Sequence, residues 1–261
     1  MIIHNTKKEK IMMTIQEIKN IAPAVFSTSA DPRMSNKYTF VPTMDIMENF
    51  VNQGWELSSV KQNGKGQFST HELRFRNGEL PAVGDTLVEA IIRNSHNGMT
   101  TLNVGAGLYR LVCSNGLTVP TSTAEQFNIR HMGFDSDEVK RLTESFAQKL
   151  PMIQSSVDKM MDRMMTEGEM IDFAKSASII KWGMGEVPVS LNFETLITPN
   201  RIEDAKNNLW TTFNVVQEKF VRGGVEYKTN KGRNTSLKGL KNIMTTNTMN
   251  TKLWELAETF V

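Results

Sequence analysis

The sequence predicts an α+β fold: an antiparallel β-sheet with an N-terminal helix packed on it, followed by a mostly helical C-terminal half. Between residues 55 and 119, apolar and polar residues alternate with a period of two, and turn sequences such as Asn97-Gly98 separate the segments. From Asp135 onward the apolar spacing changes to the helical period of about 3.6 residues. The chain has 261 residues and 39% hydrophobic content, which is enough to bury a substantial core.

The N-terminal helix is predicted over residues 43–54. Thr43 is a favourable N-cap, and Gly54 stands where a glycine commonly ends a helix. One stripe of the helix is apolar and is expected to pack on the sheet; it consists of Met44, Met47, Phe50 and Val51.

Four strands are predicted after this helix, at residues 55–60, 71–76, 87–94 and 100–112. A turn is predicted at Ser114-Asn115-Gly116, followed by a short apolar piece at 117–119. In the second strand, alternation places His71 on an apolar face, and Arg74 and Arg76 on the opposite, charged face. Gly105 and Gly107 indicate a bulge or a sharp bend in the fourth strand.

The C-terminal half is predicted to contain several helices joined by a basic segment. The helices are expected at residues 135–168 with a kink at Pro151, at 170–182, from Thr198-Pro199 to 220, and near 253–260. Residues 222–241 are interpreted as a basic linker with Glu226 as its one acid. The predicted units are an N-terminal arm (1–37), the sheet core with its helix (38–134), a helical region (135–221), and the basic linker with the terminal helix (222–261).

Composition limits the possible functions. The net charge is +2, so a nucleic-acid footprint would have to come from local clustering of basic residues. Cys113 is the single cysteine, which rules out an intramolecular disulfide and fits a reducing cytosol. No apolar run approaches the roughly 18 residues of a membrane span, and the N-terminus is too polar for a signal peptide. We therefore expect a cytoplasmic protein without membrane contacts.

No catalytic motif is present: the sequence has no Walker A motif and no GxGxxG, HExxH or GxSxG pattern. We expect no cofactor and no catalytic residue. A metal site could still assemble in space from His71, His96, Glu72 and Asp85, which would make the protein a metal-dependent nuclease. His96 is otherwise a residue that forms the turn at 95–98, or one that contacts phosphate.

Nucleic-acid binding is the leading interpretation. Arg74, Arg76, Arg93 and Arg110 lie on predicted strands and would form one electropositive track if their faces coincide. The alternative is a sheet face on which Glu72 and Glu89 pair with these arginines. Tyr38, Phe40 and Tyr109 could stack on bases or belong to the core, and Asn94, Asn97 and Asn115 could contact phosphate. The predicted nucleic-acid-binding residues are Arg74, Arg76, Arg93, His96, Arg110, Lys228, Lys231, Arg233, Lys238 and Lys241.

Several segments of the chain resemble a known family. PRMSNKYTFVPT, NQGWE, HELRFR, IIRNSHNGMTTLNVGAGLYRLVCSNGL and NNLWTTFNVV are together similar to the phage- and plasmid-like DUF932 family, over roughly residues 33–220. The resemblance implies a mobile-element protein of the host cytoplasm and supplies no reaction or catalytic residues. The order of elements is also similar to the core of Rad52-like single-strand annealing proteins, which line a groove with basic side chains and oligomerise.

Two functions of different classes follow. The first is a non-catalytic protein that binds single-stranded DNA or RNA, with annealing in recombination as its role and a homo-oligomer as its working form. The second is a protein that blocks a host defence or a host enzyme, with the Met-rich helical half as its contact surface. The metal-dependent nuclease is the third.

Overall fold

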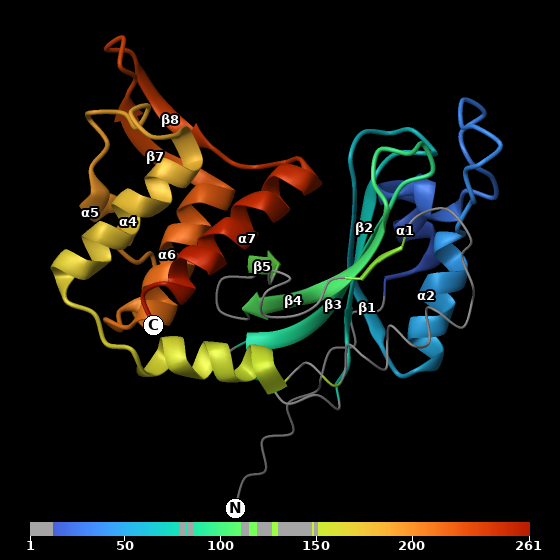
Figure 1. Ribbon diagram of the computed structural model, residues 1–261, viewed down its shortest axis with the longest axis horizontal. Coiled ribbons are helices and arrows are strands. Elements are labelled where there is room, and N and C mark those ends of the chain that lie inside the picture. Colours follow the sequence, from blue (N-terminus) through green and yellow to red (C-terminus); the bar gives the residue numbers. More distant parts are fainter. Residues whose placement is uncertain are drawn as a thin grey trace, which may run out of the picture.

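The computed structural model describes residues 13–78, 82, 86–110, 115–118, 127–129, 148 and 151–261. Within these ranges the chain forms a twisted antiparallel sheet with helices on both sides (Figure 1). The helices α1 (Ile15–Ile21) and α2 (Thr43–Asn52) and the short 3₁₀ helix η1 (Pro23–Phe26) lie on one side. The helices of the C-terminal half lie on the other. The predicted α+β class and its order of elements are confirmed.

The sheet has the strand order β1-β2-β3-β4-β5, with β6 also paired to β4. Its strands are β1 (Glu56–Gln62), β2 (His71–Arg76), β3 (Thr86–Asn94), β4 (Leu102–Arg110), β5 (Asn115–Thr118) and β6 (Phe127–Ile129). All four predicted strands are present. The turn predicted at 114–116 is wrong at Asn115 and Gly116, which belong to β5, and β6 was not predicted. The register of β3 with β4 is continuous from Thr86–Arg110 to Arg93–Asn103, so the bulge predicted at Gly105 and Gly107 does not occur there.

The helix α2 covers the apolar face of the sheet. Phe50 stacks on Phe75 of β2 with 5.0 Å between ring centroids. The predicted stripe was partly wrong, because Val51 is 51% exposed and Ile46 is buried instead. At 100° per residue, positions 43, 46, 47 and 50 share one face, whereas 51 points away from it. Pro42 is the N-cap, and Thr43 is the first helical residue.

The C-terminal half is a packed group of helices. Residues 151–162 are helical, and α4 (Glu167–Trp182), α5 (Phe193–Ile197), the 3₁₀ helix η2 (Ile202–Asp204), α6 (Leu209–Arg222) and α7 (Ile243–Glu258) follow. The helix predicted from Thr198-Pro199 is wrong in its start, because Thr198 is the C-cap of α5 and α6 begins after its N-cap Asn208. The Asn208 side chain accepts a hydrogen bond from the Thr211 amide at 2.9 Å, which fixes that start. Most of the helix predicted from Asp135 lies outside the described residues.

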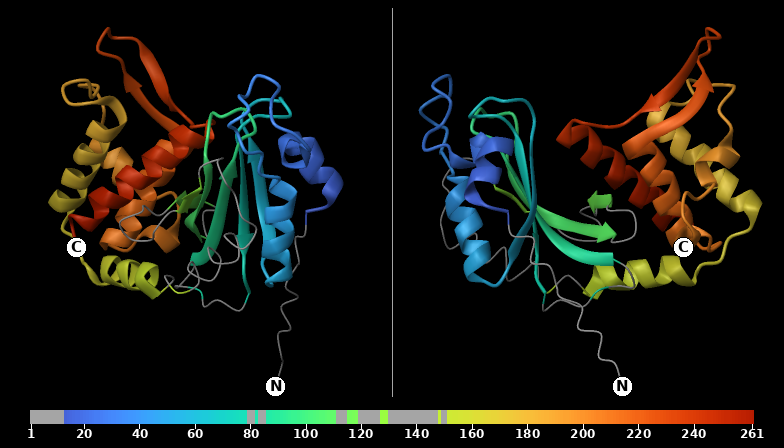
Figure 2. Two further views of the ribbon diagram at one scale, coloured as in Figure 1. Left: turned by 45° about the vertical axis from the view of Figure 1, so that its right-hand side comes forward. Right: turned by 180° about the vertical axis from the view of Figure 1, so that it is seen from behind.

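The segment predicted as a basic linker is a β-hairpin. Strands β7 (Gly223–Lys228) and β8 (Asn234–Lys238) pair antiparallel, and Figure 2 shows the hairpin projecting from the helices in both views. Val225 and Leu237 are buried, while Lys228 and Lys238 are exposed. The linker prediction is therefore wrong, because the alternation that predicts strands elsewhere is present here too among the many charges.

No helix in the described ranges combines the length and the apolar character that crossing a membrane requires.

Candidate nucleic-acid interface

Three of the predicted arginines do share one face of the sheet, but carboxylates hold all three. The register pairs Glu72 with Arg93 and Arg76 with Glu89, which brings the charged positions of β2 and β3 together. Arg74 Nε donates to Glu72 Oε1 at 2.9 Å, and Arg74 Nη1 donates to Glu89 Oε2 at 3.0 Å. Arg93 Nε donates to Glu72 Oε2 at 3.0 Å. Both glutamates and the guanidinium groups of Arg74 and Arg93 are buried.

The carboxylates of Glu72 and Glu89 also accept hydrogen bonds from uncharged side chains. Asn247 of α7 donates to Glu72 Oε2 at 3.0 Å, and Ser58 of β1 donates to Glu89 Oε1 at 3.1 Å. Burial alone would raise the pKa of Glu72, but the guanidinium groups of Arg74 and Arg93 and the Asn247 amide outweigh burial and lower this pKa to about 2. The network therefore stays ionised, and it ties α7 to the sheet.

Arg76 lies at the edge of this network. Its Nε donates to Glu89 Oε1 at 2.9 Å, and its guanidinium carbon lies 3.8 Å from the centre of the Tyr109 ring. Tyr109, a candidate stacking platform for bases, is thus covered by an arginine of its own chain.

Arg110 belongs to a different network. It alternates with Tyr109 along β4, so it leaves the other face of the strand, and its guanidinium donates to Asp204 of η2. Arg201 contacts the same carboxylate at 3.5 Å and clamps Glu218 of α6 through bonds of 2.6 and 2.7 Å. This network fastens β4 to the C-terminal half.

The predicted electropositive track of Arg74, Arg76, Arg93 and Arg110 is therefore wrong. The acids that neutralise the first three arginines lie on the same face of β2 and β3 as the arginines. The sequence HELRFR places Glu72 and Arg74 on one face of β2, and β3 adds Glu89 to that face. The alternative pairing with Glu72 and Glu89 is what the structure has, in a buried rather than a solvated form.

His96 is a packing residue rather than a surface contact. Its side chain is fully buried, its Nε2 lies 3.0 Å from the Ala24 carbonyl oxygen, and its ring lies 4.8 Å from that of Phe40. The Tyr38 hydroxyl donates to the Ser95 carbonyl at 2.9 Å, and burial raises the pKa of Tyr38 to about 12. The buried His96 side chain is therefore not placed to contact a polynucleotide.

The asparagines have structural partners. Asn94 is buried and donates to the Val41 carbonyl and to the Thr43 hydroxyl at 3.1 and 3.0 Å. The Asn97 side chain accepts from the Met99 amide at 3.2 Å. The side chain of Asn115 lies outside the described part of the structure.

Of the residues considered for a metal site, His71 and His96 come together, with 5.2 Å between their ring centroids, but Glu72 does not join them. His71 is buried, and both of its ring nitrogens have partners. Its Nε2 lies 2.8 Å from the Thr43 hydroxyl oxygen, and its Nδ1 lies 2.9 Å from the Ser69 carbonyl oxygen. Glu72, the next residue of β2, points to the opposite face. No cluster of three potential metal ligands occurs among the residues that the structure describes, and Asp85 is not one of them.

The hairpin, by contrast, carries cations that no carboxylate of the described residues neutralises. Residues 228–241 contain five exposed basic side chains for which the described residues provide no ion pair; these hairpin cations are Lys228, Lys231, Arg233, Lys238 and Lys241. Glu226 is the one acid of the two strands. An open hollow of about 730 Å³ lies beside the ribbon, lined in part by Ser190, Tyr227 and Asn234. The Ser190 hydroxyl oxygen accepts a hydrogen bond from the Lys228 amide at 2.7 Å, and this bond anchors the hairpin.

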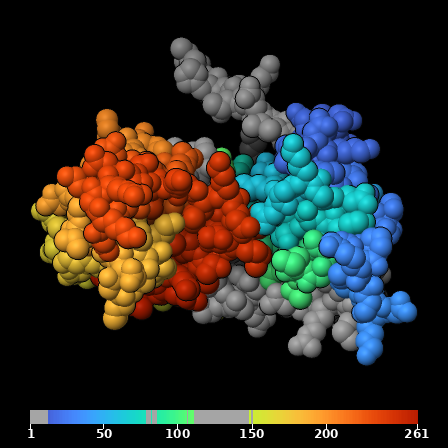
Figure 3. Space-filling view, turned by 90° about the horizontal axis from the view of Figure 1, so that it is seen from above, coloured from blue at the N-terminus to red at the C-terminus, as the bar shows by residue number. Residues whose placement is uncertain are grey.

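A second cavity, of about 410 Å³, lies where the base of the hairpin and the start of α7 meet the charged face of the sheet. We call it the junction cavity. Its basic lining residues are Lys61, Arg74, Arg222 and Lys241, and its acidic one is Glu72. Figure 3 shows the red residues of the C-terminal segment beside the cyan residues of the region around β1, β2 and their connection. Lys61 and Arg222 were not among the predicted site residues.

The family model of a domain of unknown function, DUF932, matches residues 33–254. The chain belongs to the DUF932 family. The match extends beyond the range suggested by the sequence segments and includes the whole hairpin. Two similar proteins of Escherichia coli strain K12 are the UPF0380 proteins YafZ, 28% identical over 254 residues (94% of this chain and 90% of the relative), and YfjQ, 27% identical over 257 residues (95% and 92%). No solved structure matches the chain.

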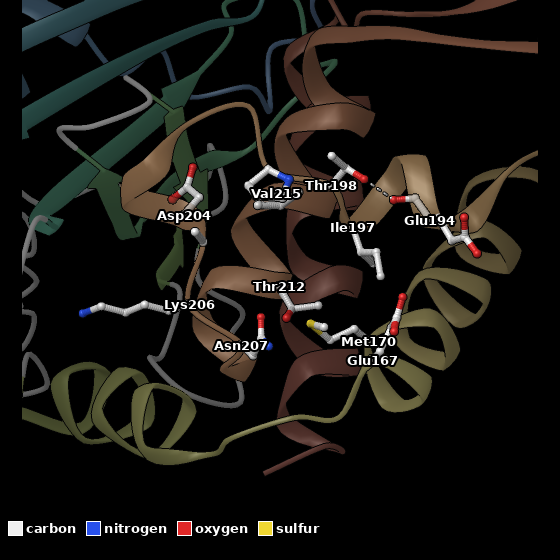
Figure 4. Close-up of a pocket in the computed structure, with 12 residues that line it drawn as sticks. Glu167, Met170, Glu194, Ile197, Thr198, Asp204, Lys206, Asn207, Thr212 and Val215 are labelled. Carbon is white, nitrogen blue, oxygen red and sulfur yellow. Dashed lines mark hydrogen bonds between the residues drawn. The ribbon is translucent and has the colours of Figure 1, made fainter.

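In this DUF932 chain a third cavity has the opposite electrostatic character. It measures about 460 Å³ and lies between α4, α5, α6 and the segment after η2 (Figure 4). Its lining contains three acidic residues, Glu167, Glu194 and Asp204, and one basic residue, Lys206. Asp204 is already bonded to Arg110. Its carboxylates make this cavity less favourable for an anion than the junction cavity, whose lining holds four basic residues and one acid.

The sequence alone does not place Lys61. Alternation counted from Leu57 would put Lys61 on the apolar face, but the register is irregular between Leu57 and Ser59, and Lys61 pairs with Glu72 on the charged face. The contribution of Arg222 and Lys241 could not be read from the sequence either, because it depends on how α7 docks on the sheet.

Proposed function

We propose that this protein binds single-stranded nucleic acid without catalysing a reaction, and that the β7–β8 hairpin is its principal contact. The observation that carries the proposal is the set of five exposed hairpin cations, which have no carboxylate partner among the described residues. Cations of this kind displace the counterions condensed on a phosphate backbone, and that release drives binding.

The face of the hairpin decides which contacts it can make. Tyr227 is half-buried and its ring meets Trp182 edge to face at 5.7 Å, so it is turned toward the helices. The exposed face carries Lys228 and Lys238, and the tip carries Lys231 and Arg233. Such a face holds the sugar–phosphate backbone and leaves the base edges accessible. We infer that binding depends weakly on sequence.

Annealing is the finer part of the proposal. The order found in the structure, a helix followed by an antiparallel meander and then further helices, is the order on which the similarity to Rad52-like annealing proteins rests. With bases left accessible, a second strand can test its pairing against the first. We expect a homo-oligomer, in a phage or plasmid setting, as the form that performs this step.

Fluorescence anisotropy with a labelled single-stranded oligonucleotide tests the proposal across a range of salt concentrations. Each lost phosphate contact on a single strand should lower the steepness of log K against log salt by about 0.7, so removing three should lower it by about 2. The test variant combines Lys228→Gln, Lys231→Gln and Arg233→Gln. The matched control combines Lys19→Gln, Lys37→Gln and Lys159→Gln, which remove the same charge from exposed sites elsewhere.

The two triple variants separate local from global electrostatics. We expect weak binding by the hairpin variant and wild-type binding by the control. Equal binding by both variants, or no binding by the wild-type protein at low salt, would overturn the proposal. A strand-annealing assay with complementary oligonucleotides then tests the finer part.

A protein-binding function is the second candidate, and one observation favours it. In the C-terminal half the methionines Met152, Met164 and Met184 expose 57%, 62% and 85% of their surface. Exposed methionine adapts to varied partners. Capture from host lysate with and without nuclease treatment distinguishes the candidates, because a partner retained after nuclease treatment supports protein binding.

A further inference from the structure

The junction cavity joins three parts of the chain that are far apart in sequence. Lys61 comes from β1, Arg74 from β2, and Arg222 and Lys241 from the two ends of the hairpin. Its volume of about 410 Å³ lies within the range of ligand pockets. We propose that this cavity is a phosphate-binding site for the strand that the hairpin holds. The inference rests on the proposed function.

The charges around the cavity favour an anion. Lys61 and Lys241 are exposed, and no described carboxylate pairs with them. The one acidic lining residue, Glu72, is already bonded to Arg74, Arg93 and Asn247. An entering phosphate would therefore meet two uncompensated ammonium groups at the rim and no free carboxylate.

The start of α7 adds to this field. Ile243, Thr246 and Asn247 of its first turns line the cavity, and the helix runs for 16 residues. The positive end of a helix dipole favours an anion near the first turn. The Asn242 N-cap holds that turn in place through its bond to the Thr245 amide at 3.1 Å.

The position of the cavity makes it continuous with the hairpin. Leu240 and Val221 both line it, and the Leu240 amide donates to the Val221 carbonyl at 2.8 Å, which closes the base of the ribbon. A strand that follows the hairpin cations from the tip to Lys241 thus arrives at this opening. We infer that the strand passes between the hairpin base and the sheet, with one phosphate held in the cavity.

Lys61 allows a test that is independent of the hairpin. It is exposed, lies on β1, and takes no part in the hairpin. The test variant is Lys61→Gln, and the control is Lys65→Gln, which removes an exposed lysine four positions away that does not line the cavity. We expect Lys61→Gln to weaken oligonucleotide binding and lower the salt steepness by about 0.7, with no change for Lys65→Gln.

The outcomes separate this inference from the function on which it rests. If the hairpin triple variant loses affinity while Lys61→Gln binds like wild type, the junction cavity is overturned and the hairpin remains. If wild-type protein does not bind, both are overturned.

A second arm uses inorganic phosphate, followed through the amide NMR signals of residues 243–247. We expect wild-type shifts that are reduced in Lys61→Gln. If phosphate shifts these signals but Lys61→Gln leaves oligonucleotide binding unchanged, the cavity takes free phosphate, and its assignment to the strand is overturned.

Discussion

The charged face of the sheet and the β7–β8 hairpin hold similar numbers of basic side chains, and they differ in what surrounds them. On the sheet, Arg74 and Arg93 are buried and share Glu72, and Glu89 completes the pairing. On the hairpin the cations are exposed, and Glu226 is the one acid of the strands. Basic residues alone therefore do not mark a polyanion-binding surface. What decides whether a cation is available is its pairing with a carboxylate and its exposure to solvent.

The first prediction would break the sheet network. Glu72→Gln removes the carboxylate that two buried guanidinium groups share, and it should lower the free energy of unfolding by about 3–5 kcal/mol, because those charges stay buried without their partner. Urea unfolding followed by circular dichroism measures this. Glu255→Gln, an exposed site on α7, should change the stability by less than about 0.5 kcal/mol. Similar midpoints for the two variants would show that the network contributes little.

The second prediction concerns pH and the apolar face of the same sheet. Burial lowers the pKa of His71 to about 4, the neighbouring His96 ring adds to this, and the Ser69 carbonyl opposes it. A carbonyl only accepts, so Nδ1 carries the proton and Nε2 accepts from the Thr43 hydroxyl, which fits a neutral ring.

The unfolded chain binds a proton at His71 near pH 6.5, whereas the folded chain does so only near pH 4. The contribution of His71 to the free energy of unfolding is therefore fully present above pH 6.5. It should fall by about 1.4 kcal/mol per pH unit as the pH drops toward 4. Denaturation midpoints across this range measure the slope. The same slope in His71→Gln would assign it to other groups.

The third prediction tests how closely the hairpin is held to its base. Gly223 has φ of 81°, and a Cβ there would meet the Leu237 carbonyl oxygen and lie 2.7 Å from the Gly239 amide nitrogen. Its neighbour Gly224 has φ of 91° and open space around it. Both alanine variants carry the cost of a positive φ, about 1–2 kcal/mol, and Gly223→Ala should lose about 1–3 kcal/mol more through the clash. Thermal unfolding compares the pair, and equal losses would mean that the ribbon base is loosely packed.

The smallest effect is expected at Arg76, on the border between the two kinds of cation. Its side chain is 30% exposed, paired with Glu89 and stacked on Tyr109. Arg76→Gln should cost about 0.5–1 kcal/mol in stability and leave oligonucleotide affinity unchanged. A loss of affinity as large as that of a hairpin variant would show that the sheet face also binds the strand.

Local patterning made a good part of the fold predictable. The strand His71–Arg76 was predicted with its bounds and faces, because alternation reports directly which side chains share a face. The hairpin was missed for the opposite reason: its many charges concealed an alternation in which Val225 and Leu237 are the buried positions. At α2, the hydroxyl of Thr43 lies against His71 rather than capping the helix, a contact between segments that no local rule contains.

The sequence by itself determined the class of the fold, the order of α2 and the strands β1 to β4, and the face shared by Arg74 and Arg76, since these follow from spacing along a single strand or helix. Which cations remain available was decided only by the tertiary structure. Ion pairing depends on distances of a few ångströms between segments such as β2, β3 and η2, and burial removes the water that would otherwise weaken those pairs. The same reason explains why the junction cavity could not be foreseen: its lining comes from strands and a helix that meet only when α7 docks on the sheet.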